Sequence, residues 1–235
     1  MKKTLLIPQL SGAFLKGDRR NWVDVVKEFG TKGELTPQRW EPYYTNAQEI
    51  TTSFALAYFE STLFVYFRVE EEEIRAQYRE HGDPVSQDSC VEIFIQGSDA
   101  RYVNFETNPN GALLANIGFS RYGRLAINPS FFEELAIFPK IINEYEWETL
   151  LILPLHHTPL IGEATTLEGM QLKGNLFKCG DFLKKPHYLA WSDVETPTPD
   201  FHQSEYFKEL LFLWGDPVLN CPCKEPFHIG DSNIH

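Results

Sequence analysis

The chain has 235 residues, of which 43% are hydrophobic and 14% aromatic, and its net charge at pH 7 is −12. This length fits one large all-β domain, and a chain of this size buries roughly 70–75% of the surface that its unfolded form exposes, so it needs no disulfide or metal to fold. The acidic charge, without any basic cluster, argues against nucleic acid and anionic membranes as partners. No segment approaches the ~20 consecutive apolar residues that span a bilayer.

The amino terminus imitates the start of a signal peptide. Two lysines follow Met1, but Pro8 ends the apolar run after about four residues, well short of the roughly 7–15 residues of a true signal. We therefore interpret residues 4–7 as a first strand. Without an export signal the protein is expected to be cytoplasmic, or periplasmic or secreted if a leader precedes this chain.

Short runs of β-branched and aromatic residues, separated by turn-forming residues, predict a series of strands. In chain order these strands are expected at residues 54–58, 63–69, 90–95, 102–107, 112–117, 136–142, 145–153, 172–179, 187–191 and 209–214. Helical periodicity is clear at residues 21–29, and a further helical turn is expected at residues 131–135.

The expected fold class is all-β, an antiparallel β-sandwich of the jelly-roll or immunoglobulin-like type with one or two short helices. The sequence contains no strand–helix–strand alternation, no internal repeat and no linker rich in Pro, Gly or Ser. We therefore expect residues 1–235 to form a single domain. From Gly215 onward prolines replace the periodic pattern, so residues 215–235 are expected to be an irregular wrap or a loose tail.

Two neighbouring strands are expected to place polar side chains on one face of the sheet. The apolar residues at positions 91, 93 and 95 form one face, so the alternation directs Glu92 to the opposite face. In the partner strand the same rule directs Asn104 and Glu106 to that face, and Lys178 lies opposite in phase to Phe177. For an arbitrary sandwich, a solvated or loop-covered face is the more common outcome. The alternative is a sugar platform, in which rings stack on sugar C–H faces and polar groups bind hydroxyls.

The order of several segments resembles the family 9 carbohydrate-binding modules. These segments include a strand ending in acids at residues 63–74, the Asp-Ser-Cys-Val-Glu-Ile-Phe strand at 88–94 and the Asn-Pro-Asn-Gly turn at 108–111. Later segments at 174–181, 187–192 and 199–202 resemble the branch of this family that is common in Bacteroidetes. The resemblance covers roughly residues 40–213. It implies a β-sandwich that binds sugar, supports polysaccharide catabolism and has no catalytic centre of its own.

The resemblance also implies where a mono- or oligosaccharide would bind. The best-known members clamp a terminal sugar between two tryptophans, whose positions fall near Val85, which cannot stack, and at Phe201, which can. The family's glutamate matches Glu92, while Asn104 and Lys178 take the places of its arginine and glutamine. The two-tryptophan clamp is therefore absent. The expected ligand-binding residues are Glu92, Asn104, Lys178, Phe201 and, at the rim, His202.

A carboxylate pair keeps an enzymatic alternative open. Glu92 and Glu106 fall on neighbouring strands, and a glycoside hydrolase needs two carboxylates about 5–10 Å apart. However, no aromatic-walled cleft is evident, and no serine-hydrolase, phosphate-loop or zinc-protease motif occurs. We therefore expect no catalytic residues and rank glycosidic hydrolysis second. Haem binding ranks last, because Met1 and Met170 are the only methionines.

No cofactor is expected, with a structural calcium ion as the one weak candidate. Asp83 and Asp88 could be its ligands, because calcium prefers oxygen ligands, but their spacing is not that of an EF-hand and a solvated loop is favoured. His156 and His157 follow a predicted strand, where adjacent side chains point apart, so no metal pair is expected there. The Cys-Pro-Cys segment at 221–223 lacks the second pair of a zinc site.

Overall fold

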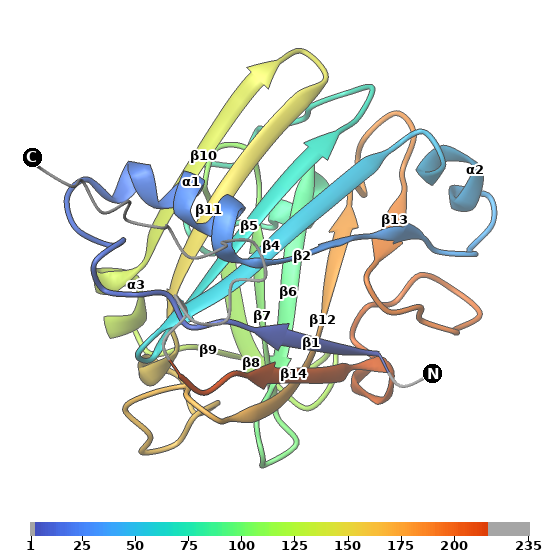
Figure 1. Ribbon diagram of the computed structural model, residues 1–235. Coiled ribbons are helices and arrows are strands. Elements are labelled where there is room, and N and C mark those ends of the chain that lie inside the picture. Colours follow the sequence, from blue (N-terminus) through green and yellow to red (C-terminus); the bar gives the residue numbers. More distant parts are fainter. Residues whose placement is uncertain (1–2, 216–235) are drawn as a thin grey trace, which may run out of the picture.

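The computed structural model describes residues 3–215, in which two β-sheets face each other across a hydrophobic core (Figure 1). The small sheet has five antiparallel strands in the order β10-β11-β5-β4-β2. Its strands are β2 (Thr31–Glu34), β4 (Thr51–Phe59), β5 (Thr62–Glu70), β10 (Ala136–Asn143) and β11 (Glu146–Pro154).

The large sheet has nine strands, with the path β1-β14-β12-β6-β7-β8-β9 and the short strands β13 and β3 joined beside β12. All of its pairings are antiparallel except that of β1 with β14. Its strands are β1 (Thr4–Ile7), β3 (Thr36–Pro37), β6 (Cys90–Gln96), β7 (Tyr102–Thr107), β8 (Leu113–Gly118), β9 (Leu125–Ala126), β12 (Gln171–Cys179), β13 (Tyr188–Ala190) and β14 (Lys208–Phe212).

The helices of the described residues are short. There are three α-helices, α1 (Trp22–Phe29), α2 (Tyr43–Ala47) and α3 (Ser130–Glu134), and four 3₁₀ turns, η1 (Arg19–Asn21), η2 (Val85–Gln87), η3 (Leu155–His157) and η4 (Ser204–Tyr206). Both predicted helical segments are confirmed, and α2 makes one helix more than expected. Within residues 3–215, no helix combines the length and the apolar character that crossing a membrane requires.

The predicted sandwich and its main strands are confirmed, with strand ends within three residues of those expected. The strands that the sequence did not predict are short and lack alternation, such as β2, whose residues are Thr-Lys-Gly-Glu. The segment expected to be irregular, 215–235, lies outside the described residues apart from Gly215, as does the Cys-Pro-Cys segment.

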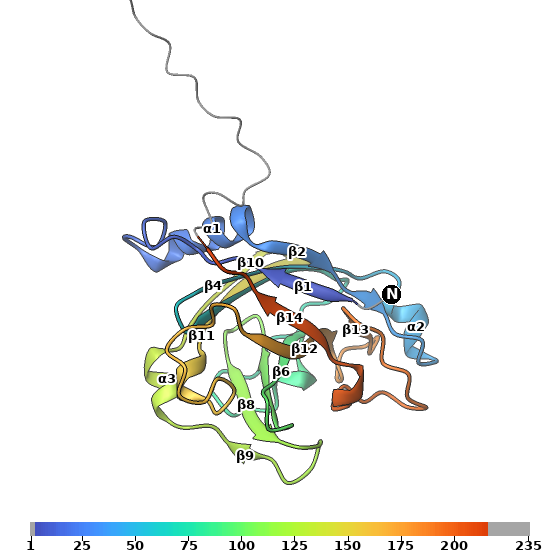
Figure 2. The same ribbon diagram turned by 60° about the horizontal axis from the view of Figure 1, so that its bottom comes forward.

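Both faces of the small sheet are covered by other parts of the chain. Figure 2 shows α1 on the outer face of this sheet and the large sheet beneath its inner face. Val26 of α1 packs with Ala55, Phe64 and Leu150 on the outer face, whereas Phe67 faces the core between the sheets. Since both faces are buried, β4 and β5 are nearly continuous hydrophobic runs rather than alternating ones.

The outer face of the large sheet is also covered, but by a loop. Phe94, Tyr102 and Phe177 from β6, β7 and β12 pack with Phe201 and Phe207 in a second hydrophobic cluster. The covering rings come from the segment 192–207, so the outer face is a loop-covered surface rather than an open platform. This cover shapes the cavity described below.

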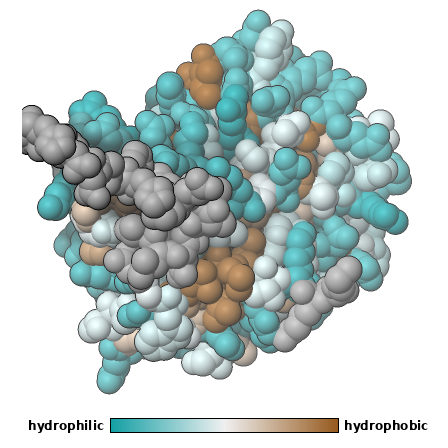
Figure 3. All heavy atoms as spheres, in the orientation of Figure 1, coloured by the Kyte–Doolittle hydropathy of each residue, from teal (hydrophilic) through white to brown (hydrophobic). Residues whose placement is uncertain are grey.

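The strand β1 leaves one large apolar side chain open to solvent, beside the exposed Thr4. Figure 3 shows a mostly hydrophilic face with a brown patch over β1. Leu6 keeps 48% of its surface exposed, while Leu5 and Ile7 on the other side of the strand are buried. This alternation is that of an edge strand with one face on the core.

Candidate functional site

A pocket opens on the outer face of the large sheet, beneath the segment 192–207. Phe201 and Tyr188 contribute aromatic surface to its wall. Its acidic, basic and imidazole-bearing lining residues are Glu92, Glu106, Arg121, Asp181, Asp200 and His202. Because four of these six are carboxylic acids, we call this cavity the acidic pocket. It brings together three of the five residues that the sequence predicted, Glu92, Phe201 and His202.

Two glutamates stand side by side in the acidic pocket. Glu92 of β6 and Glu106 of β7 are direct partners in the antiparallel pairing, so both side chains lie on the outer face. They are only 3% and 5% exposed. Burial raises the pKa of Glu106 to about 7. Burial and the neighbouring Glu106 charge raise the pKa of Glu92 well above its ordinary value. Near neutral pH this pair therefore retains protons and can donate as well as accept hydrogen bonds.

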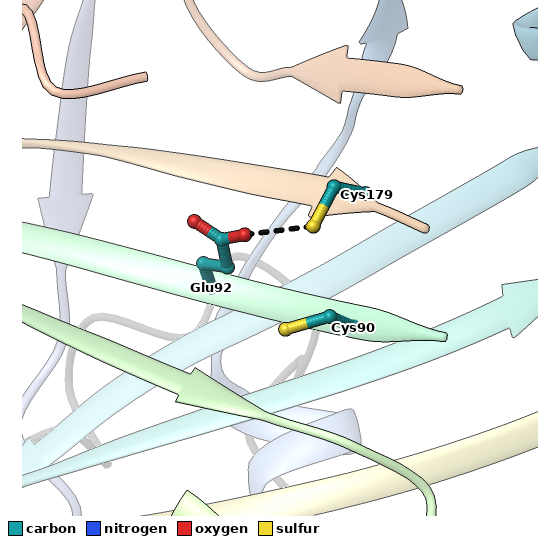
Figure 4. Close-up of side chains that lie close together, drawn as sticks. All are labelled: Cys90, Glu92 and Cys179. Atoms are coloured by element: carbon teal, nitrogen blue, oxygen red, sulfur yellow. Dashed lines mark hydrogen bonds between the residues drawn. The ribbon is translucent and has the colours of Figure 1, made fainter. Parts of the chain in front are cut away.

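Two thiols lie beside Glu92 (Figure 4). Cys90 and Cys179 are direct partners across β6 and β12, and Cys179 Sγ donates a hydrogen bond of 3.0 Å to Glu92 Oε1. Burial raises the pKa of Cys90 to about 12, and the Cys90 thiol together with burial raises the pKa of Cys179 well above its ordinary value. Both side chains are therefore neutral thiols, which are poor nucleophiles.

His202 reaches the acidic pocket from the covering segment. Its Nδ1 atom lies 2.9 Å from Tyr102 Oη, and its ring lies 4.9 Å from the ring of Phe94. Burial and the positive charge of Arg124 lower the pKa of His202 to about 4. The imidazole is therefore neutral at physiological pH, and its other nitrogen is available to a polar ligand.

The Phe201 ring packs against the sheet and holds the covering segment in place, so it is not an open stacking surface. Its ring stacks on Phe177 at a centroid distance of 4.1 Å and an interplanar angle of 14°. Trp40 and Tyr188 contact the same ring at 5.7 and 5.8 Å, and only 8% of the residue is exposed. The full face of this ring is therefore not open to a ligand.

Asn104 lies on the expected face but does not line the pocket. Its Nδ2 group donates a 2.7 Å hydrogen bond to Glu106 Oε1, and its Oδ1 atom accepts one of 3.0 Å from Arg124 Nε. Arg124 also stacks over the Tyr102 ring at 4.3 Å. Asn104 therefore positions Glu106 within a buried network. The guanidinium of this network comes from the β8–β9 connection.

Lys178 lies on the opposite face of the sheet from the acidic pocket. The prediction that it lies beside Glu92 is therefore wrong. The β12–β6 register pairs Phe177 with Glu92 and Lys178 with Val91. Side chains paired across a ladder share a face, so Lys178 points with Val91 between the sheets. There it is completely buried. The alternation placed Lys178 and Phe177 on opposite faces correctly, but only the register shows which of the two accompanies Glu92.

Four charged residues of this region were not predicted from the sequence. Asp181 and Asp200 lie within segments that carry the family resemblance, so a signal for them was present. Arg121, which lies 3.4 Å from Asp200, and Arg124 come from the β8–β9 connection, where no pattern marks them. Burial raises the pKa of Asp181, as it does for the two glutamates.

The two calcium candidates, Asp83 and Asp88, accept hydrogen bonds from loops near them. Asp88 is completely buried, and its Oδ2 atom accepts hydrogen bonds from the backbone N–H groups of Gln77 and Tyr78 and from Asn108 Nδ2, at 2.8–3.0 Å. Asp83 likewise accepts from backbone N–H groups of its own loop. All of these bonds are made by Oδ2, whereas Asp88 Oδ1 makes no hydrogen bond with the described residues and lies 3.5 Å from Arg75 Nε. Both carboxylates hold loops in place.

The chain also matches a known protein family. The model of carbohydrate-binding family 9 matches residues 34–212, which is more than half of the chain and close to the expected 40–213. This chain belongs to carbohydrate-binding family 9. The family favours a non-catalytic binding module and carbohydrate as the class of ligand.

Solved structures share the fold. A protein from Bacteroides uniformis ATCC 8492, whose description proposes that it binds carbohydrate, is 26% identical, with a TM-score of 0.78 over 90% of this chain and 100% of that chain. A family 9 module from Caldicellulosiruptor kristjanssonii has a TM-score of 0.58 in both of its complexes. The glucose complex is 13% identical, with 91% of this chain and 96% of that chain covered, and the cellotriose complex is 14% identical, with 95% and 100% covered. A comparison with curated proteins found no match.

Proposed function

We propose that this family 9 chain binds a mono- or oligosaccharide without catalysing a reaction, and that the acidic pocket holds the sugar. The observation that carries this proposal is the convergence of Glu92, Glu106 and His202 in one cavity on a rigid sheet face. Family membership supports the class of ligand. The complexes of the Caldicellulosiruptor kristjanssonii module with glucose and cellotriose support it further.

Hydrogen bonds contribute more to this binding than stacking does. A sugar hydroxyl is both a donor and an acceptor, and Glu92 and Glu106, with their raised pKa values, match it as a pair that can do both. The neutral His202 adds a further polar contact at the mouth. Phe201 and Tyr188 supply apolar wall, but the Phe201 ring has one face on Phe177. Support of polysaccharide catabolism stays a prediction.

The geometry favours binding over glycosidic hydrolysis. Hydrolysis needs two carboxyl groups that flank the scissile bond from opposite sides. Glu92 and Glu106 are cross-strand neighbours on a single sheet face, so they would contact a ligand from the same side. Burial and the charge of Asp181 raise the pKa of both glutamates, and the Glu106 charge raises that of Glu92 further, so the raised pKa values need no catalytic role.

A glycan array followed by calorimetry tests this proposal. Glu106→Met keeps the side-chain length and removes both hydrogen-bonding oxygens, so it should weaken sugar affinity about tenfold, the worth of one to two lost hydrogen bonds. Glu205→Gln, at an exposed acid outside the pocket, is the matched control and should bind normally. Thermal melts of each variant verify folding.

Two results would contradict the proposal. One is a folded Glu106→Met variant that binds the selected sugar as the unmodified chain does, which would move the site elsewhere. The other is continuous release of reducing sugar that is lost in Glu92→Gln, which would favour the hydrolase. A chain that binds no glycan on the array would remove the carbohydrate function itself.

A further inference from the structure

Two adjacent histidines and a glutamate converge at the end of the sandwich where α3 lies. His156 and His157 form the end of η3, and Glu134 is the last residue of α3. Figures 1 and 2 both show α3 on the side of the molecule opposite to β13, whose Tyr188 lines the acidic pocket. The cluster is therefore separate from the proposed sugar site.

The ligand atoms of this cluster are close enough to share one metal ion. His156 Nε2 lies 3.3 Å from Glu134 Oε2, and His157 Nε2 lies 3.2 Å from Glu134 Oε1. The three ligand groups lie within 4.8 Å of one another. Zinc bonds to imidazole nitrogen and carboxylate oxygen are about 2.0–2.2 Å long, so two ligand atoms on one zinc ion lie about 3.3–3.6 Å apart. The two histidine–carboxylate separations are close to this value, with each imidazole facing a different oxygen of Glu134.

The surroundings of the two imidazoles also fit metal ligands. His156 Nδ1 lies 3.0 Å from Ser61 Oγ. In the tautomer whose Nδ1–H donates to this hydroxyl, the Nε2 lone pair faces Glu134. Metal-bound histidines commonly use the second ring nitrogen in this way. His157 Nε2 is shielded from solvent and makes no hydrogen bond of good geometry with the described residues. A cation between the rings and the carboxylate satisfies all three groups.

The local backbone explains why both rings can face one carboxylate. The sequence predicted that these histidines continue directly from a strand, in which neighbouring side chains point to opposite sides. They lie instead in a 3₁₀ turn, in which successive side chains are about 120° apart. Their ring centroids are consequently only 4.1 Å apart. The expectation that no metal pair forms there therefore rested on the wrong local structure.

We propose that His156, His157 and Glu134 form a site for a divalent transition-metal ion of the zinc class, which clamps α3 onto η3. Two imidazoles and one carboxylate are a ligand set that zinc uses with a water at the fourth position. The Glu134 side chain is 56% exposed, which leaves room for that water. Arg19 is a charged group near Glu134, and it stabilises the carboxylate rather than supplying a ligand.

Calorimetric titration of zinc into the chelator-treated full chain tests this site. We expect one zinc ion per chain, and an affinity at least about tenfold lower in His156→Gln, in His157→Gln and in Glu134→Gln. Glu133→Gln makes the same charge change on the same helix, but Glu133 is not in the cluster, so this control should bind zinc normally. Thermal melts with and without zinc should show stabilisation that is lost in the three ligand variants.

Further variants separate this site from other ligands in the chain. Cys90, Glu92 and Cys179 form the other possible group among the described residues, so Cys179→Ser should leave zinc affinity unchanged. The double variant Cys221→Ser/Cys223→Ser should do the same. Zinc binding that is unchanged in the double variant His156→Gln/His157→Gln would overturn the proposal, as would the absence of zinc binding in the unmodified chain. The histidines and Glu134 would then form ion pairs only. Neither result would affect the test of sugar binding.

Discussion

The ammonium group of Lys178 lies 2.8 Å from Glu71 Oε2, and both side chains are buried between the sheets. Trp147 Nε1 donates a 2.7 Å hydrogen bond to the other oxygen of Glu71, and His187 Nε2 lies 2.8 Å from Lys178 Nζ. Burial and the Lys178 charge lower the pKa of His187 to about 2, so this ring is neutral and accepts a hydrogen bond from the ammonium. Lys178 of β12 is therefore bonded to Glu71, the first residue after β5, and links the two sheets.

Lys178→Met should destabilise the fold by about 3–5 kcal/mol, because it leaves the buried Glu71 carboxylate without its cation. The double variant Lys178→Met/Glu71→Gln should recover part of this loss. Urea unfolding measures both. A Lys178→Met variant with unchanged stability but weakened sugar binding would contradict the structural role and return Lys178 to the binding residues.

Phe201→Ala should lower the free energy of unfolding by about 3–5 kcal/mol, because a ring packed against Phe177, Trp40 and Tyr188 leaves a cavity when it is removed. Phe201→Leu fills part of that cavity and should cost less. Urea unfolding tests this order, and sugar affinity is measured separately on the folded variants. If both variants are as stable as the unmodified chain, Phe201 does not anchor the covering segment.

Folding stability should fall as the pH rises from about 5 to 8. The folded-state pKa of Glu106 is about 7, above its ordinary value of 4.5, so the folded chain binds more protons than the unfolded chain in this range. The resulting stabilisation is complete below about pH 4.5 and is lost as the pH rises through 7. Glu92 acts in the same direction.

Glu106→Gln should therefore flatten the pH dependence of unfolding, since glutamine does not titrate. Urea unfolding at several pH values measures this, with Glu205→Gln as the control at an exposed acid. An unchanged slope in Glu106→Gln would mean that Glu106 ionises normally in the folded chain.

Added calcium should not raise the melting temperature of the chelator-treated protein, because Asp88 and Asp83 already accept hydrogen bonds from N–H donors. Asp88→Asn, in contrast, should cost about 2 kcal/mol through the loss of charge-assisted hydrogen bonds to the loop before β6. Thermal unfolding measures both effects. Stabilisation by calcium that disappears in Asp88→Asn would show that this carboxylate is a calcium ligand after all.

The alternation of side chains along the strands could be predicted from the sequence alone. It placed Glu92, Asn104 and Glu106 on one face and Val91 on the other, as the structure has them. This works because neighbouring residues on a strand point to opposite sides whatever the strand pairs with. Runs of β-branched and aromatic residues between turns located the main strands, and helical periodicity located α1.

The tertiary structure alone decided how those faces are used. The register of β12 against β6 directs Lys178 inward and Phe177 outward. The segment 192–207 covers the outer face, and it is fixed by contacts such as the 2.8 Å hydrogen bond from Trp40 Nε1 to the backbone oxygen of Thr196. Register and cover depend on contacts between residues far apart in the chain, whereas the pattern within one strand records only which side chains share a face.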